Sequence, residues 1–566
     1  MPTTLKLRVL TNSDDALIAW APSAFIPGCR GFLLERERRG AAVEAVENRV
    51  GFKADKPKSG EHRPSSEWPF QRFNWTDHAV DVGAELRYRV TAMVDSGTGR
   101  PYGRGPASRW SAWQTLGTGV GGGMSCFFNR GLVLSQFVAR YLRDHQLTPA
   151  QFKAQLKTGV DPVFRRFLQG DLGVALFALL TGGGKQGARL HAALYELDDA
   201  QIEAAMIALG PHLDLILANG SDRAGDGNAA ARSRLNAAGI PSIDRLLKSK
   251  GLGHNKFVVA SKSGVAKAVW TGSTNWSTTG LCTQVNNALL IADAPLAAHY
   301  QAQWARLRDA SPPVLTPAGF PPALVAANDV PKTFAIGAAK AEVWFTRSSD
   351  GRDMAALRAL ISGARNSVLF LMFTPGKQGL HTLAAARAKE PGMYVRGVVS
   401  TLGSTAADQD INFVDIGLVS SGQAFQPDRY SVPQPQGIEQ GFGAWIAEVT
   451  RSDFLAQVGH AIVHSKVLVI DALSDAPVVV TGSHNFSASA SEKNDENFVI
   501  VRGHKRLAAA YATNIMAVYQ HYRFRAYVRQ KLAEGKTPWS ALQDDDLWLT
   551  DELVSKAQEI GFWTGA

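Results

Sequence analysis

The chain has 566 residues, with 60 Lys and Arg against 50 Asp and Glu, and a formal net charge of +10. Hydrophobic residues make up 45% and charged residues 19%, which excludes wholesale disorder, collagen-like repeats and coiled-coil rods. At roughly 150 residues per domain, this length predicts about three or four domains.

Residues 1–118 predict an all-β domain. Short apolar or alternating runs, separated by Gly, Pro, Asp and Ser, occur at 5–11, 16–22, 31–39, 85–94 and 110–118, and this is the pattern of a β-sandwich. The runs ALIAWAP and LRYRVTAMV, followed by GRGPASRWSAW, resemble strands B, F and G of a fibronectin type III domain, which is immunoglobulin-like. The resemblance implies a core position for Trp20, a corner position for Tyr88, and a protein or carbohydrate partner.

Two α/β segments follow. Residues 117–123 (GTGVGGG) predict a flexible linker, and the first α/β domain is expected over 125–310. In it, helical spacing occurs at 135–145, 149–157, 187–197 and 199–210, and a buried strand is expected at 212–220. A second linker is expected near 311–331, where Pro is frequent.

The α/β pattern then restarts and predicts a second domain over 332–530. Strands are expected at 341–346, 367–374 and 393–401, with a helix at 352–364. A Pro-, Gly- and Gln-rich stretch at 420–443 is typical of a lid or binding loop. Residues 531–566 are expected to form a C-terminal helical extension.

An internal duplication is the most informative feature. Residues 254–291 align without a gap on residues 464–501, so that His254 falls on His464, Lys256 on Lys466 and Asn275 on Asn485. Each copy predicts strand, turn, strand and then Gly-Ser-x-Asn at a helix start. Because side chains two apart share one face of a strand, His and Lys are expected side by side. Two such half-sites predict paired domains that meet at a pseudo-twofold axis.

The repeated pattern H-x-K-x4-D, followed by G-S-x-N, resembles that of the phospholipase D superfamily of phosphodiesterases. The second copy matches at His464, Lys466, Asp471, Ser483 and Asn485; the first has Ser261 in place of the Asp. The resemblance implies an α/β fold of two phospholipase D-like α/β/α domains, related by the pseudo-twofold axis and preceded by the β-sandwich. It also implies that neither a metal nor another cofactor is needed. Supporting roles are expected for Asp471, Ser273, Ser483 and Asn286.

The repeated residues suit phosphodiester cleavage. One imidazole can attack phosphorus to give a phosphohistidine while the other protonates the leaving oxygen. The lysines and the amides of Asn275 and Asn485 can stabilise the charge on the phosphate. The resemblance implies that an acidic residue after each motif orients the histidine of the opposite half. Glu496 has this position for His254, whereas Asn286 faces His464, so we expect His254 as nucleophile and His464 as acid and base.

Three interpretations of the substrate are open. The forms GSTNWS and GSHNFS resemble the nuclease-like branch, and the positive net charge favours nucleic acid. The main alternative is a phospholipase D or phosphatidyl transferase on phospholipids, with residues 425–442 as an interfacial lid. A third interpretation is a binding protein with an inactive core. The three distant cysteines and the lack of a secretory signal pattern predict a cytoplasmic location.

Overall fold

The fold is known from a computed structural model, which describes most of the chain. The described residues are 3–58, 61–131, 146–148, 151, 154–156, 162–183, 187–220, 225–376, 379–399, 463–533 and 541–565. Within this part, one compact unit comprises residues 3–117 and 509–565, and the other comprises 118–399 and 463–508. The helix expected at 135–145, most of that at 149–157, and the loop at 420–443 with the lid at 425–442 lie outside the described residues.

The first unit contains two antiparallel sheets around one apolar core. One sheet has the order β1-β2-β7 and the other β10-β8-β3-β4, with β9 beside β8. The bounds are β1 (Leu5–Thr11), β2 (Ala16–Pro22), β3 (Cys29–Arg38), β4 (Glu44–Ala45), β7 (Asn74–Asp77), β8 (Glu85–Val94), β9 (Gly103–Ala107) and β10 (Gln114–Thr115). A small hairpin of β5 (Glu47–Asn48) and β6 (Arg63–Pro64) accompanies them. Trp20 is fully buried in the shared core, as expected.

The segment 110–118 departs from the expected strand. Only Gln114 and Thr115 join the sheet, as β10. The indoles of Trp110 and Trp113 instead stack on the guanidinium of Arg87, at 4.9 and 4.7 Å from the ring centroids. This stacking adds to isolated backbone hydrogen bonds, such as that from the N–H of Ser111 to the carbonyl oxygen of Tyr88 (2.8 Å). Tyr88 is buried, and its hydroxyl donates to the carboxylate of Asp77 (2.9 Å).

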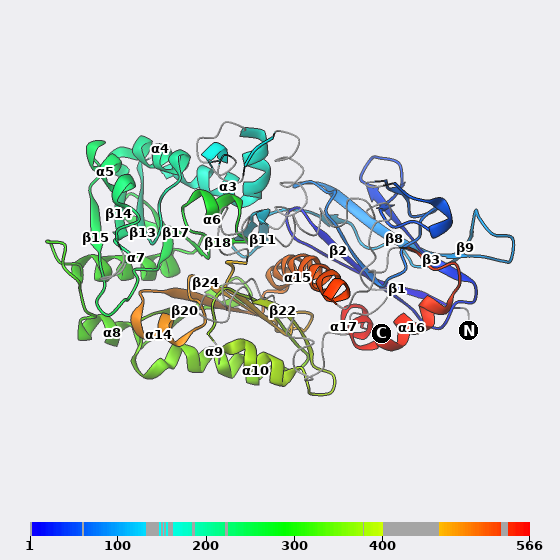
Figure 1. Ribbon diagram of the computed structural model, residues 1–566. Helices are drawn as coiled ribbons and strands as arrows, with labels where there is room; N and C mark the ends of the chain where they lie inside the picture. The colour runs from blue at the N-terminus through cyan, green and yellow to red at the C-terminus, as the bar shows by residue number, and fades with distance from the viewer. Residues whose placement is uncertain are drawn as a thin grey trace. The chain divides into compact units, whose positions relative to one another are not determined.

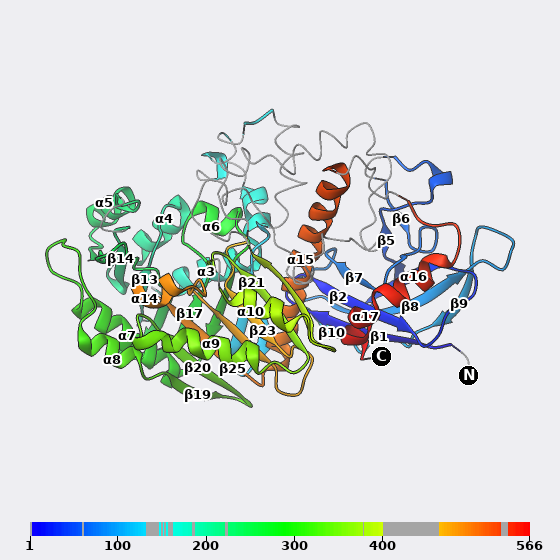
Figure 2. The same ribbon diagram turned by 60° about the horizontal axis from the view of Figure 1, so that its bottom comes forward.

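The C-terminal helices complete the core of this unit. They are α16 (Leu547–Ser555) and α17 (Ala557–Thr564), and they follow α15 (Lys505–Ala533) in the chain. α17 packs against β1 and β2 (Figure 2). Trp548 lies in the same cluster as Trp20, and its indole N–H donates to the carbonyl oxygen of Cys29 (2.9 Å).

The second unit contains two mixed sheets. The first sheet has the order β11-β12-β18-β17-β16-β13-β14-β15 and the second has the order β19-β20-β25-β24-β23-β21-β22. From β12 to β14 and from β20 to β22 the two orders correspond strand for strand, with a single parallel pair in each stretch, β13–β14 and β21–β22. Figure 1 shows α9 and α10 along one face of the second sheet.

The first sheet consists of β11 (Gly119–Gly121), β12 (Met124–Phe128), β13 (Ala188–Leu194), β14 (Leu213–Ala218), β15 (Ser242–Arg245), β16 (Lys256–Lys262), β17 (Val265–Gly272) and β18 (Asn287–Ile291). Its helices are α3 (Pro162–Gly183), α4 (Ala200–Leu209), α5 (Ala229–Ala237), α6 (Thr278–Cys282) and α7 (Ala294–Asp309). The second sheet consists of β19 (Lys332–Ile336), β20 (Ala339–Phe345), β21 (Ser367–Met372), β22 (Tyr394–Val399), β23 (Val467–Ile470), β24 (Val478–Gly482) and β25 (Asn497–Arg502). Its helices are α8 (Pro322–Asn328), α9 (Arg352–Ser362), α10 (Leu380–Arg387) and α14 (Ala488–Lys493).

Two expectations for the first sheet are wrong. The segment 187–197, expected as a helix, forms the central strand β13, which pairs with β14 and β16. Leu190, Ala193 and Leu194 are also spaced as on one face of a helix, so the apolar pattern alone fits either element. The glycine-rich linker expected at 117–123 contains the edge strand β11, which pairs with β12. The expected strands and helix of the second domain are confirmed as β20, β21, β22 and α9.

No helix in the described part of the chain is long and apolar enough to cross a lipid bilayer.

Candidate active site

The two repeated histidines lie just before their strands, not within them. β16 begins at Lys256 and β23 at Val467, which corrects the expectation of His and Lys on one strand face. The N–H of His254 donates to the carbonyl oxygen of Leu252 (2.8 Å), and that of His464 to the carbonyl oxygen of Val285 (3.0 Å). Both histidines therefore lie outside the strand ladder, and each imidazole contacts the other repeat.

Each imidazole contacts a side chain of the opposite repeat. Nδ1 of His254 lies 2.7 Å from Oε2 of Glu496, and Nδ1 of His464 lies 3.0 Å from Oδ1 of Asn286. The partners are 242 and 178 residues apart in the chain. The structure therefore brings together both histidines and both residues expected to orient them.

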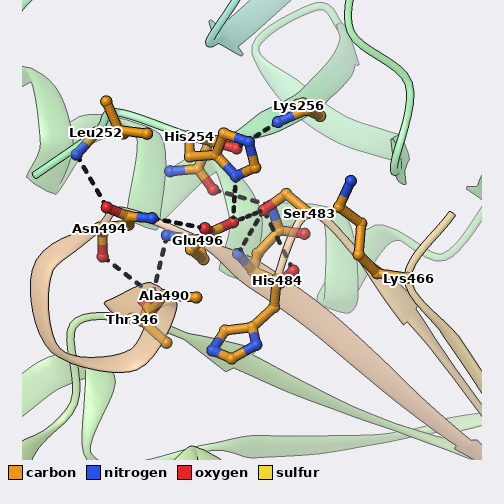
Figure 3. A network of polar contacts seen from close by, with 12 residues as sticks. Leu252, His254, Lys256, Thr346, Lys466, Ser483, His484, Ala490, Asn494 and Glu496 are labelled. Atoms are coloured by element: carbon orange, nitrogen blue, oxygen red, sulfur yellow. Dashed lines mark hydrogen bonds and ion pairs between the residues drawn. The ribbon is translucent and has the colours of Figure 1, made fainter. Parts of the chain in front are cut away.

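Glu496 is held by a closed network of donors (Figure 3). Its Oε2 also accepts from the hydroxyl of Ser483 (2.9 Å), and its Oε1 accepts from the side-chain amide of Asn494 (3.0 Å). Asn494 in turn accepts from the N–H of Leu252 (3.0 Å). An ionised carboxylate only accepts hydrogen bonds, so Nδ1 of His254 carries the proton and its Nε2 keeps a lone pair.

The amide of Asn286 is held in one orientation. Its Nδ2 donates to the carbonyl oxygen of Gly280 (2.9 Å), and its Oδ1 accepts from the hydroxyl of Ser273 (2.7 Å). Oδ1 must therefore face His464, whose Nδ1 donates to it. A neutral amide replaces the carboxylate in this half, and the two imidazoles differ electrostatically.

Lys256 and Lys466 are buried beside the histidines. Each ammonium donates to the carbonyl oxygen of the histidine two residues before it. Nζ of Lys256 lies 5.0 Å from the ring centroid of Tyr195, and Nζ of Lys466 lies 4.9 Å from that of Phe373. The same rings contact the neighbouring imidazoles, at 4.6 and 4.8 Å between centroids. Two matching cradles of aromatic ring, ammonium and imidazole result.

Burial controls the charge of these groups. It lowers the pKa of His254 to about 4, although the Glu496 carboxylate opposes the shift. It also holds the pKa of His464 well below its ordinary value, and the ammonium of Lys466 adds to the effect. Burial lowers the pKa of Lys256 to about 8, and lowers that of Lys466 well below its ordinary range. Both imidazoles are therefore neutral near pH 7.

The Gly-Ser-x-Asn segments place the two asparagines after β17 and β24. The hydroxyls of Ser277 and Ser487, two residues after each Asn, accept from backbone N–H groups and cap α6 and α14. These caps explain the Ser that ends both motif copies. The Nδ2 of Asn275 donates to Oε2 of Glu196 (2.6 Å).

Sequence reasoning missed three side chains of this site: Tyr195, Glu196 and Phe373. They lie outside the repeated segments, directly after the buried strands β13 and β21. Polar or aromatic residues at the carboxyl ends of parallel-paired strands are the signal that could have found them. Burial raises the pKa of Glu196, and the ammonium of Lys256 opposes the rise.

Asp471 and Ser261 act on the fold rather than on the reacting groups. The carboxylate of Asp471 accepts from the backbone N–H groups of Arg365, Asn366 and Ser367, where β21 begins. In the first copy, Ser261 donates to the carbonyl oxygen of Arg189 (3.1 Å), on β13. The departure of the first motif therefore changes a strand contact and leaves the histidines untouched.

Residues 357–518 match the family described as cardiolipin synthase, PLD-like domain. This stretch includes His464, Lys466 and Asn485 of the second repeat. The similarity to a PLD-like domain extends over these residues. No curated protein matches the chain.

Solved structures similar to the chain include phosphatidylserine synthase from Haemophilus influenzae Rd KW20. It is 12% identical over 70% of this chain and 94% of that one, with a TM-score of 0.40. Nuc, a phospholipase D family member from Salmonella typhimurium, is 21% identical. The match covers 25% of this chain and 91% of Nuc, with a TM-score of 0.21. Yeast tyrosyl-DNA phosphodiesterase is 11% identical. The match covers 58% of this chain and 86% of the yeast protein, with a TM-score of 0.29. Each match thus covers a larger share of the other protein than of this chain.

Among the residues that the structure describes, no group of three or more His, Cys, Asp or Glu side chains is arranged to hold a metal ion.

Proposed function

We propose that this protein is a metal-independent phosphodiesterase that acts through a phosphohistidine and cleaves nucleic acid. The observation that carries the proposal is the hydrogen bond between His254 and Glu496, which joins the two repeats at 2.7 Å. It gives one buried, neutral imidazole a fixed tautomer and a free Nε2 beside two buried ammonium groups. A nucleophile held by a carboxylate and flanked by cations suits attack on a phosphate.

In the first step, Nε2 of His254 attacks phosphorus. A P–N bond forms, the P–O bond to the leaving oxygen breaks, and His464 gives that oxygen a proton. A phosphate bound between the lysines raises the pKa of His464, which lets it carry this proton. Lys256 and Lys466 stabilise the charge on the non-bridging oxygens, with the amides of Asn275 and Asn485.

In the second step, His464 takes a proton from water. The water oxygen bonds to phosphorus, the P–N bond breaks, and the electron pair returns to Nε2 of His254. Glu496 keeps the proton on Nδ1 and offsets the positive charge of the phosphorylated imidazole. An imidazolium at His464 faces only the neutral Asn286 and releases its proton more readily, which suits an acid.

We also propose an approximate twofold relation between the two repeats. It is supported by the corresponding strand orders and by two reciprocal hydrogen bonds. The hydroxyl of Thr271 donates to Oδ1 of Asn497 (2.6 Å), and that of Thr481 donates to Oδ1 of Asn287 (2.7 Å). For the first unit, the two antiparallel sheets and the buried Trp20 support a fibronectin type III-like domain.

The net charge of +10 and the Asn-Trp-Ser and Asn-Phe-Ser endings of the motifs support nucleic acid as the substrate. The match to a family described as cardiolipin synthase supports a second candidate, a phospholipid. Both substrates contain a phosphodiester, so the catalytic groups have the same roles in either case.

The test is cleavage of labelled single- and double-stranded DNA and RNA in excess EDTA. His254→Ala is compared with wild type and with His212→Ala, a histidine outside the site. Cleavage that survives EDTA and is lost only in His254→Ala supports the proposal. Hydrolysis of phosphatidylcholine or phosphatidylglycerol vesicles, without cleavage of nucleic acid, would transfer the mechanism to lipids. Binding of nucleic acid or lipid without any turnover would refute catalysis.

A further inference from the structure

Glu196 places a carboxylate beside the catalytic groups. The proposed mechanism gives this carboxylate no role. Glu196 follows Tyr195, whose ring contacts both His254 and Lys256. Its Oε2 accepts from Nδ2 of Asn275 at 2.6 Å. The charges of Lys256 and Lys466 both act on it. The carboxylate is therefore close to the position that the proposed mechanism gives to the phosphate.

The second half of the site has no such carboxylate. Ala193 of β13 pairs with Phe257, and Leu371 of β21 pairs with Val467, which is the equivalent of Phe257 in the repeat. Counting on from these pairs, Tyr195 corresponds to Phe373 and Glu196 to Thr374. The aromatic cradle is thus duplicated, but the carboxylate is not. The carboxylate of Glu196 therefore belongs to the first half of the site alone.

The charges around the site suggest a role for this carboxylate. The two buried lysines bring positive charge to the site, and the carboxylate of Glu496 brings negative charge against His254. Glu196 adds a second carboxylate, hydrogen-bonded to Asn275, which the proposed mechanism places against the phosphate. A phosphodiester carries one negative charge, whereas a phosphomonoester carries nearly two at pH 7.5. At an effective dielectric constant of about 20, repulsion from a carboxylate about 12 Å away disfavours each negative charge by about tenfold, and a closer carboxylate disfavours it more.

We propose that Glu196 is a specificity-determining residue that makes the site favour singly charged phosphodiesters over doubly charged phosphomonoesters. The inference rests on the proposed function. In the second step, water converts the phosphohistidine, which keeps one ester bond, into a phosphomonoester and free His254. The product has one more negative charge than the substrate, so the same repulsion also favours its release.

The experiment measures inhibition constants of dimethyl phosphate and methyl phosphate at pH 7.5. Bis(p-nitrophenyl) phosphate serves as the substrate for wild type, Glu196→Gln and Glu196→Asp. The ratio of the methyl phosphate constant to the dimethyl phosphate constant is expected to fall by at least about tenfold in Glu196→Gln. It should stay near the wild-type value in Glu196→Asp, which keeps the charge. An unchanged ratio in Glu196→Gln would overturn the inference.

A second variant tests the same inference by adding a carboxylate instead of removing one. Thr374→Glu places a carboxylate at the equivalent position of the other half, and the ratio is expected to rise by at least about tenfold. A ratio that does not rise would count against the charge argument even if Glu196→Gln failed to fold. If the wild-type protein does not turn over the diester, the proposed function fails. Calorimetric binding of the two methylated phosphates would then test the charge effect of Glu196 by itself.

Discussion

Glu496→Gln is the substitution that separates the proposed roles of the two histidines most clearly. The carboxylate accepts three side-chain hydrogen bonds, from His254, Ser483 and Asn494. A glutamine has one acceptor oxygen, which can serve His254 and Ser483 together. Its NH₂ group would then face the NH₂ group of Asn494. Asn494 cannot turn over without losing the bond from the N–H of Leu252.

The magnitudes follow from these contacts. Leaving one buried donor without an acceptor costs about 1–3 kcal/mol in the free energy of unfolding. The loss of the carboxylate also removes the charge that stabilises a phosphorylated His254. We expect a fall in the rate of phosphoenzyme formation of about 100- to 10,000-fold, as for carboxylates that orient a catalytic imidazole.

The assay is single-turnover cleavage of a diester under rapid quench, with urea unfolding on the same protein. Glu203→Gln is the matched control, because Glu203 is a buried carboxylate that pairs with Arg234 outside the site. It is expected to lose stability without a change in the phosphorylation rate. A phosphorylation rate for Glu496→Gln within about threefold of wild type would refute the role given to this carboxylate.

Three further predictions concern pH and stability. First, kcat/KM should decline as pH rises through about 8, because the ammonium of Lys256 has a pKa of about 8; a pH–rate profile of Lys256→Arg, which stays charged, should lack that contribution. Second, the pKa of His254 is about 4 in the folded protein and 6.5 in the unfolded chain. Its contribution to the free energy of unfolding is therefore fully present above pH 6.5. Urea titrations should show that contribution being lost as the pH falls to 4. Third, Asp471→Ala should lower the free energy of unfolding by about 2–4 kcal/mol, because three backbone N–H groups lose their acceptor; a loss under 0.5 kcal/mol would contradict that reasoning.

The internal repeat carried most of what the sequence could predict about the site. His254, Lys256 and their second-copy equivalents are close to one another because a gapless duplication preserves the strand and the turn that follow. The partner of His254 could be inferred only through the family resemblance, since the repeat itself does not say which halves face each other. The exact start of the strands was not predictable, because alternation continues through His254 although the backbone has left the ladder.

The missed features depend on contacts between segments that are far apart in the chain. Glu196 follows a strand that was interpreted as a helix, because Leu190, Ala193 and Leu194 are also spaced as on one face of a helix. Without β13 there was no reason to place a carboxylate at its carboxyl end. The strand expected over 110–118 failed for a similar reason, since stacking of Trp110 and Trp113 on Arg87 is not encoded in a hydrophobic pattern.

The covalent intermediate is the most direct test of the proposed mechanism. Wild-type protein would be mixed with a labelled diester, quenched at high pH within one turnover, digested and analysed by mass spectrometry. The mechanism predicts one phosphoryl adduct, on His254, that decays as product forms. An adduct on His464 would reverse the roles of the two halves, and turnover without any histidine adduct would contradict the mechanism itself.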